Sequence, residues 1–234
     1  MNYADLVYFD IETAGNYKDL STLQSNDVRG YELFMRKIER KSENFSDWKH
    51  DDPNEVYISK ASLIPEFGRI VCVSIATIIK EEFMETGQLK IISICDKDEQ
   101  TIINKTQKIF TNISNKTLLG ISGFYIKGFD IPWLNRKFLQ YGLTIPKVMQ
   151  TFNKKPWEMN IVDLSEVWKN FGTLEHVSFD EMLYLLDISS PKLTITGKDV
   201  HYNFWNGDLE KIKTYCESDV IACIETAKKI IHLI

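Results

Sequence analysis

The chain has 234 residues, of which 44% are apolar and 26% charged. These proportions are typical of a globular protein and exclude a disordered or fibrous chain. Lys and Arg number 28 against 33 Asp and Glu, so the formal net charge is −5. Because such a chain does not attract polyanions as a whole, any nucleic-acid binding must use a local patch or bound cations.

The cysteines at 72, 95, 216 and 223 form no Cys-x-x-Cys pair and lack the histidine spacing of a zinc site. We therefore expect reduced thiols in a cytosolic protein. The first residues show no basic segment followed by an apolar run, so we expect no secretory signal. The longest apolar stretch, 70–79, is too short to span a bilayer, and the length suits one domain over 1–234.

The start of the chain predicts a strand followed by a helical insertion. The apolar run 6–9 leads into Asp10-Ile11-Glu12-Thr13, which indicates a buried strand with acids at its end. Residues 14–60 are densely charged. Four apolar side chains recur there at helical spacing: Tyr31, Phe34, Met35 and Ile38. This insertion, which includes Trp48, is a candidate lid or partner-docking element, or decoration beside the edge of strand one.

The rest of the chain alternates between predicted strands and helices. We expect further strands over 70–79, 89–94, 117–121 and 160–164. We expect helices over 98–110, 131–141 and 179–186, and a last helix that begins with Asp208 as its N-cap. This order predicts an α/β fold with a mixed five-stranded sheet flanked by helices.

Two acids on the first strand are the first candidates for chemistry. Because side chains alternate along a strand, Asp10 and Glu12 project from the same side. Two like charges at the end of an apolar strand are costly, and a divalent cation such as Mg²⁺ or Mn²⁺ offsets that cost. The alternative is a solvated acid pair with no ligand.

Three more candidates follow later in the chain. Tyr215 and Asp219 lie four residues apart in the last helix, so they share one face; the alternative is an ordinary, partly exposed helix face. Asp130 follows the fourth strand at the start of a helix, and on local grounds it is equally suited to be an N-cap.

Together these motifs resemble the DEDD superfamily of 3′-5′ exonucleases, in its tyrosine-bearing branch. The likeness is to the proofreading domain of family B DNA polymerases and to stand-alone bacterial or phage relatives. It rests on segments 9–13, 123–132 and 215–219, with support from 66–71, 155–158 and 208–212. It implies a ribonuclease H-like fold and cleavage of a DNA 3′ end, single-stranded or frayed, in the cytoplasm of a bacterial or phage-infected cell.

The resemblance also assigns roles by position. Asp10, Glu12 and Asp219 would ligate one of two Mg²⁺ or Mn²⁺ ions, with Asp10 bridging to a second ion held by Asp130. Tyr215 would orient the attacking water. The histidines nearest this motif, at 201 and 232, stand outside it.

Substrate contacts are expected near the second motif. The expected set is Thr13, Phe124, Tyr125 and Phe129, and the three aromatic residues are either stacking platforms or core. Family members commonly carry asparagine where this chain has Tyr125, which alters the substrate contact there. Basic residues expected near phosphates are Lys127, Arg136, Lys137, Lys154 and Lys155.

Two other functions remain open at this stage. One is an RNA 3′-5′ exonuclease on the same fold, and the other is a non-catalytic module that binds nucleic acid or a polymerase. Retention of all four acids and the tyrosine favours the enzyme. The 234 residues hold no polymerase domain, so proofreading would serve a replicative DNA polymerase in trans.

Overall fold

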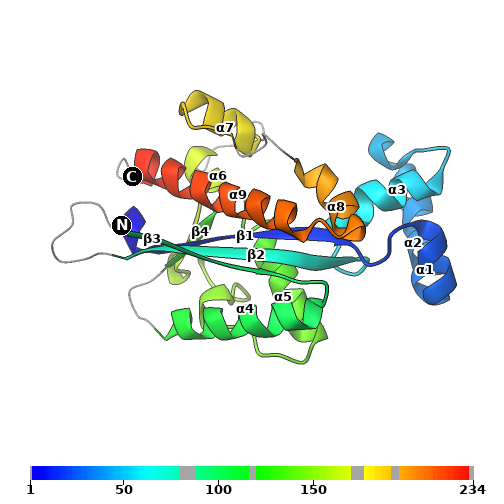
Figure 1. The fold of residues 1–234 in the computed structure, drawn as a ribbon, viewed down its shortest axis with the longest axis horizontal. Coiled ribbons are helices and arrows are strands. Elements are labelled where there is room, and N and C mark those ends of the chain that lie inside the picture. The colour runs from blue at the N-terminus through cyan, green and yellow to red at the C-terminus, as the bar shows by residue number, and fades with distance from the viewer. Residues whose placement is uncertain (1, 80–87, 116–119, 170–176, 191–194, 232–234) are drawn as a thin grey trace.

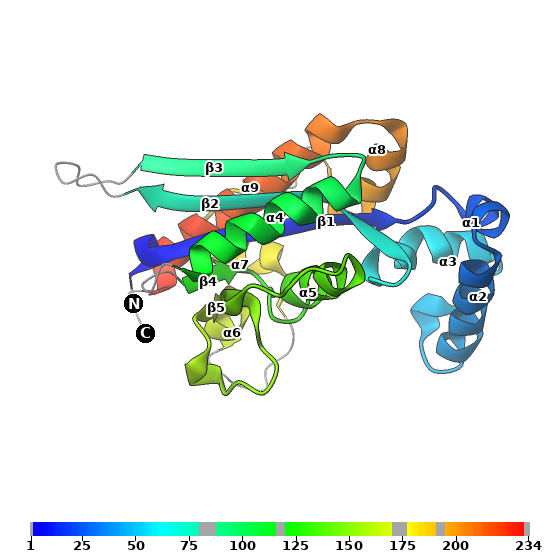
Figure 2. The same ribbon diagram turned by 90° about the horizontal axis from the view of Figure 1, so that it is seen from below.

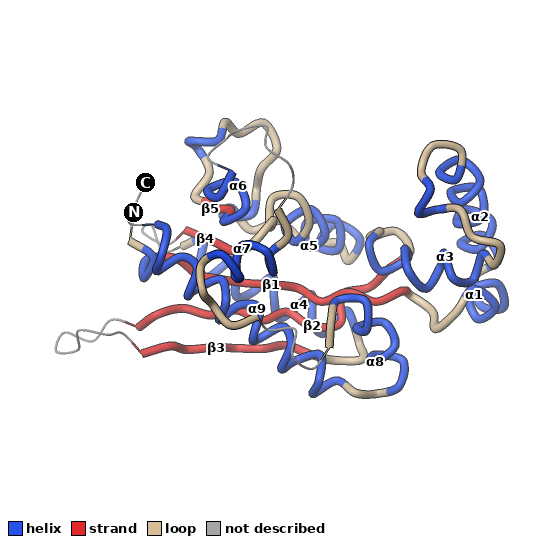
Figure 3. Tube along the Cα trace, turned by 90° about the horizontal axis from the view of Figure 1, so that it is seen from above, coloured by secondary structure: helices blue, strands red, loops and turns tan. Residues whose placement is uncertain are grey.

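The computed structural model describes residues 2–79, 88–115, 120–169, 177–190 and 195–231. Five strands lie side by side in the order β3-β2-β1-β4-β5 (Figure 3). Their bounds are β1 Leu6–Gly15, β2 Gly68–Ile79, β3 Gln88–Cys95, β4 Gly120–Gly123 and β5 Ile161–Asp163. Strands β1, β2 and β3 pair antiparallel, whereas β4 pairs parallel with both β1 and β5. The predicted mixed five-stranded sheet is confirmed.

Helices cover both faces of this sheet (Figures 1 and 2). Helices α4 (Glu99–Ser114) and α5 (Asp130–Gln140) lie on one face. The other face carries α9 (Leu209–Ile230) together with α6 (Leu164–Lys169), α7 (Phe179–Leu185) and α8 (Val200–Asn206). Short 3-10 turns connect these elements: Tyr3–Asp5, Ser46–Trp48, Ala61–Leu63, Lys147–Met149, Pro156–Glu158 and Gly197–Asp199.

Strand β1 is sandwiched between the two helical layers. Its odd-numbered residues Val7 and Phe9 pack in the cluster that α4 and α5 complete, and the Phe9 ring meets Phe110 edge-on at 5.1 Å. Leu6 and Tyr8 pack instead against α9. The alternation therefore directs the even-numbered side chains, including those at positions 10 and 12, toward α9.

Strand β1 is longer than the sequence indicates. It continues through Ala14 and Gly15, so the first helix of the insertion starts only at Leu20. Residues 117–119 of the predicted fourth strand lie outside the described residues. At the start of α9, Asp208 occupies the N-cap position but makes no capping bond, and its carboxylate pairs instead with Lys211 at 2.9 Å.

The insertion forms three helices with a small core of their own. They are α1 (Leu20–Asn26), α2 (Val28–Ser42) and α3 (Pro53–Lys60). The apolar face predicted for α2 is present, with Phe34 packed between Tyr57 and Trp48. Because β1 lies in the middle of the sheet, the insertion extends from the end of β1 and not from a sheet edge (Figure 1).

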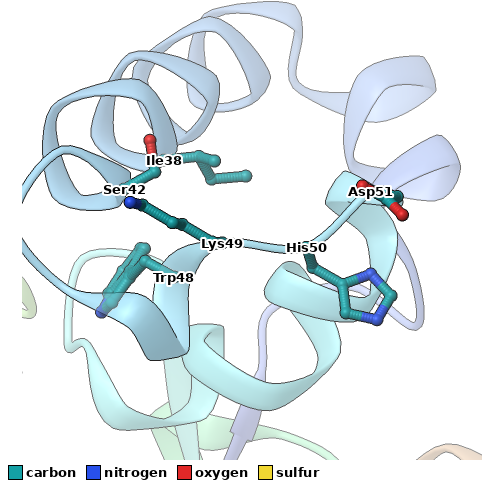
Figure 4. Close-up of a pocket in the computed structure, with 6 residues that line it drawn as sticks. All are labelled: Ile38, Ser42, Trp48, Lys49, His50 and Asp51. Atoms are coloured by element: carbon teal, nitrogen blue, oxygen red, sulfur yellow. The ribbon is translucent and has the colours of Figure 1, made fainter.

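A pocket of about 460 Å³ opens within the insertion (Figure 4). Its lining comes from α2 and the segment after it: Ile38, Ser42, Trp48, Lys49, His50 and Asp51. A single carboxylate lines it, so it offers no group of acids that would hold a cation. Among the described residues, no helix has both the length and the apolar character needed to cross a membrane.

One predicted phosphate contact is wrong. Lys137 lies inside the protein, 1% exposed, with its Nζ 3.2 Å from Glu99 and 2.7 Å from the carbonyl oxygen of Gly68. Glu99 also accepts hydrogen bonds from the Ile70 amide and the Tyr141 hydroxyl. Two charges spaced 38 residues apart thus tie α4 to α5 and to the start of β2.

Replacement of Lys137 by methionine is expected to lower the free energy of unfolding by about 3–5 kcal/mol, because it leaves the Glu99 charge buried without its partner. Denaturant unfolding measures the change. Lys105→Met, on the exposed face of α4, is the matched control. Equal stability of the two variants would contradict a structural role for Lys137.

Candidate active site

A pocket of about 320 Å³ lies where β1, α5 and α9 meet. All five residues predicted to be catalytic line it: Asp10, Glu12, Asp130, Tyr215 and Asp219. The remaining lining residues are Ile11, Phe124, Tyr125, Phe129, Ser178 and Phe179. Segments more than 200 residues apart in the sequence therefore converge on one pocket.

Asp10 and Glu12 come from the central strand and face α9. Asp10 is partly buried and stands opposite Ser74 of β2, whereas Glu12 is 7% exposed and stands opposite Cys72. The register between β1 and β2 shifts immediately after Glu12. Such a bulge turns the strand, and Thr13 does not line the pocket. Its hydroxyl donates instead to the carbonyl oxygen of Ser62 at 2.6 Å.

Asp130 is the first residue of α5, and the N-cap alternative for it is wrong. The N-cap position belongs to Phe129. The Asp130 Oδ1 accepts a hydrogen bond of 3.1 Å from the backbone amide of Ile11, which lies between the two acids of β1. This bond joins the start of α5 to the central strand, and it holds the Asp130 carboxylate, 3% exposed, at the pocket.

Tyr215 and Asp219 lie one turn apart on the buried side of α9, so the exposed-face alternative is wrong for both. The Tyr215 hydroxyl lies near the Asp219 carboxylate. Burial raises the pKa of Tyr215 above its ordinary value, and the nearby carboxylates raise it further. The phenol therefore keeps its proton at neutral pH.

The acids share a strongly unfavourable electrostatic environment. Burial raises the pKa of Asp10 and of Glu12 well above the ordinary carboxyl range, and Cys216 and the neighbouring acids raise both further. Burial also raises the pKa of Asp130 to about 7, although its backbone hydrogen bonds act in the opposite direction. A cation favours the charged form of each group. These hard oxygen donors fit Mg²⁺ or Mn²⁺.

Aromatic side chains form the other wall of the pocket. Phe124 stacks on Phe179 with ring centroids 4.7 Å apart, and Phe129 packs on Trp133 at 5.8 Å. Tyr125 is 44% exposed. The structure thus packs Phe124 and Phe129 against neighbouring rings, and Tyr125 is the most exposed of the three predicted stacking residues.

Tyr125 also has a left-handed backbone, with φ of 58°. Asparagine adopts this conformation more readily than most residues, which gives a physical reason for the asparagine common at this position in the resembled family. Tyrosine there stores strain at the edge of the pocket.

Sequence reasoning missed the residue that holds this wall in place. Asp163, at the end of β5, accepts hydrogen bonds from the amides of Tyr125 and Lys127, each at 2.9 Å, and from Ser165. It is 2% exposed. An acid that follows an apolar strand is the sequence feature that identifies Asp10, and Asp163 has the same feature because it follows Ile161 and Val162.

The other expected site residues lie outside the pocket or have structural partners. His201 accepts from the Gly15 amide at 3.0 Å through Nδ1 and contacts the Lys18 carbonyl through Nε2, so it joins α8 to the end of β1. Burial lowers its pKa. Lys127 pairs with Glu166 at 2.6 Å. Position 232 lies outside the described residues.

Comparison with known proteins assigns the chain to a family. Residues 63–224 match a family described as a predicted 3′-5′ exonuclease related to the exonuclease domain of PolB, and the chain belongs to this family. The matched segment contains Asp130, Tyr215 and Asp219 and begins after the two acids of β1. No curated protein matches the sequence.

Solved structures are similar to the chain at low identity. The family B DNA polymerase from the hyperthermophilic archaeon Pyrobaculum calidifontis matches with a TM-score of 0.56 and 14% identity, over 97% of this chain and 24% of the polymerase chain. A structure of exonuclease I matches 95% of this chain and 40% of its own, with 13% identity and a TM-score of 0.42. The chain therefore spans less than half of either protein. The polymerase likeness confirms the ribonuclease H-like fold.

The raised pKa of Asp130 predicts how stability depends on pH without metal. The folded chain keeps this proton up to about pH 7, whereas an unfolded Asp loses it near about 3.9. The folded state binds more protons between these values, so the free energy of unfolding falls as the pH rises through this window.

Asp130→Asn is expected to remove part of that decline and to stabilise the chain in EDTA above neutral pH, by at most about 4 kcal/mol. Denaturant unfolding in EDTA across this pH window measures it. Asp51→Asn, at an exposed position, should leave the decline as in the unmodified chain. An unchanged pH slope in Asp130→Asn would refute this assignment of the proton.

Proposed function

We propose that the protein is a divalent-cation-dependent exonuclease that removes nucleotides from the 3′ end of DNA, at single-stranded or frayed termini. The observation that supports this most strongly is the convergence of four acids and one tyrosine, from three distant segments, on a single pocket. A non-catalytic scaffold would gain nothing from burying like charges together. The family to which the chain belongs supports the same reaction class.

The four acids are proposed to hold two ions, Mg²⁺ or Mn²⁺. Asp10, Glu12 and Asp219 are the ligands proposed for one ion, and Asp10 and Asp130 for the other. When bound, such an ion pair lowers the pKa of water and stabilises the leaving 3′ oxygen. The hydrogen bond from the Ile11 amide keeps the Asp130 carboxylate in place before substrate arrives.

Tyr215 is proposed to position the attacking water. Its hydroxyl lies beside the proposed cation ligands Asp219, Glu12 and Asp10, and its raised pKa excludes a role as general base near neutral pH. The phenol thus acts through geometry, since correct placement of a reactant is itself a large part of catalysis.

Tyr125 is proposed to receive the terminal base. Its ring is the exposed member of the aromatic wall, and base stacking on such a ring tolerates every base identity. We also propose that a DNA polymerase supplies the DNA end, since the chain shares its fold with part of a family B DNA polymerase.

Asp10→Ala is expected to abolish cleavage and to leave the chain folded, because it removes the acid shared by both ion sites. The test follows a labelled DNA oligonucleotide with an unpaired 3′ end in Mg²⁺ or Mn²⁺, beside an RNA of the same sequence. Asp51→Ala is the surface control. If the unmodified protein leaves the DNA full-length with either ion, the proposed function fails, and faster loss of the RNA would reassign the substrate.

Tyr215→Phe is expected to slow DNA cleavage by about 10- to 1000-fold, the scale of losing one well-placed hydrogen-bonding group. Single-turnover kinetics at saturating enzyme separates this loss from weaker binding. A rate equal to that of the unmodified protein would exclude the water-positioning role.

Tyr125→Ala is expected to weaken binding of a single-stranded 3′ end by about 1–3 kcal/mol, the contribution of one stacked base. Fluorescence anisotropy in the Asp10→Ala background measures it. Tyr184→Ala provides a control, because Tyr184 is 86% exposed and does not line the pocket. Equal affinity of the two variants would show that Tyr125 does not bind the base.

A further inference from the structure

A thiol lies among the acids of the proposed cation site. Cys216 directly follows Tyr215 in α9 and is fully buried. Its Sγ lies 3.5 Å from Oδ2 of Asp10 and 3.5 Å from the backbone oxygen of the same residue. One ligand atom each of Asp10, Glu12 and Cys216 lies within 4.8 Å of the other two.

This spacing is close to what a single ion requires. Metal bonds of about 2.0–2.3 Å to oxygen and sulfur keep two donors of one ion within about 4.5 Å of each other. The three donors therefore need only small side-chain rotations to share an ion. Asp130 and Asp219 are not part of this three-residue group.

The Glu12 carboxylate indicates that the group binds a ligand. It is 93% buried, lines the pocket, and makes no hydrogen bond or ion pair with any residue that the structure describes. A buried carboxylate without a partner is costly, and a cation held by the three donors supplies the missing partner.

We infer that Cys216 is a metal ligand, and that Asp10, Glu12 and Cys216 together bind a thiophilic divalent cation such as Co²⁺, Zn²⁺ or Cd²⁺. Binding replaces the S–H bond by a sulfur–metal bond and releases one proton to the solvent. The inference concerns the same site as the proposed function, but it does not require catalysis. Sulfur favours these ions over Mg²⁺, which prefers oxygen.

The consequence is a site with two classes of occupant. Hard ions engage the carboxylates alone, whereas thiophilic ions also engage the thiol and compete for Asp10 and Glu12. Cys72 packs in the same buried cluster as Cys216. Cys95 is only half-buried and is not part of the three-residue group, which makes it a matched control.

The test is titration of the full metal-free chain with Co²⁺, followed by absorption. A thiolate ligand produces a sulfur-to-cobalt charge-transfer band in the near ultraviolet, while the visible bands report cobalt binding by any donors. We expect the charge-transfer band in the unmodified protein and in Cys95→Ser, and its loss in Cys216→Ser. Cys216→Ser should also weaken Cd²⁺ binding at least about tenfold and weaken it more than it weakens Mn²⁺ binding.

Cobalt binding without the charge-transfer band, or a band that persists in Cys216→Ser, would overturn the inference, as would a failure of the chain to bind Co²⁺. If Cys216→Ser does not fold, cadmium NMR of the unmodified protein decides, because a thiolate shifts the cadmium resonance far downfield of an all-oxygen site. DNA cleavage in Mg²⁺ without the band refutes only the cysteine ligand. The band without cleavage in any ion refutes only the proposed function.

Discussion

Burial of several carboxylates side by side is the constraint around which this fold is arranged. Asp10 and Glu12 come from the central strand, Asp130 from the start of α5 and Asp219 from the helix that covers the sheet. Glu12, Asp130 and Asp219 each raise the pKa of Asp10. Apolar side chains of similar volume at these positions would make the fold more stable. The four acids are therefore explained by the negative charge that they place in the pocket, and not by stability.

Position in the sheet makes that burial possible. Strand β1 pairs with β2 from Val7 to Gly15 and with β4 at Leu6–Tyr8, and a helical layer covers each face of the sheet. Alternation then divides its side chains between an apolar layer toward α4 and α5 and a mixed layer toward α9. The same strand therefore supplies both the core and two of the acids.

The sequence was sufficient for elements whose signal is local. The run 6–13 predicted the strand and the acids that it carries, and the spacing of Tyr215 and Asp219 predicted that they share one helix face. Both predictions depend on the periods of strand and helix, which fix the direction of side chains only a few residues apart. The apolar residues of 28–42 likewise predicted the one-sided helix α2.

Features that depend on distant partners could not be predicted. Lys137 is a charged residue of a kind usually found at the surface. Its burial is explained by its ion pair with Glu99, which lies on another helix. The position of Asp130 fits an N-cap, yet its partner is the amide of Ile11, 119 residues away. The left-handed backbone of Tyr125 breaks the local preference of tyrosine, and the bonds from Asp163 to the neighbouring amides hold the surrounding loop.

The hydrogen bonds of Asp163 attach the loop at Tyr125 to β5, the shortest of the described strands. Strand β5 is three residues long and, among the described strands, pairs with β4 alone, so it has fewer backbone bonds than β1, the strand that carries Asp10 and Glu12. Short edge segments open at lower free energy than the centre of a fold. Detachment of β5 would release the loop at Tyr125 while β1 and α9 stay paired, so the width of the entrance and the rigidity of the acid cluster are set by separate parts of the molecule.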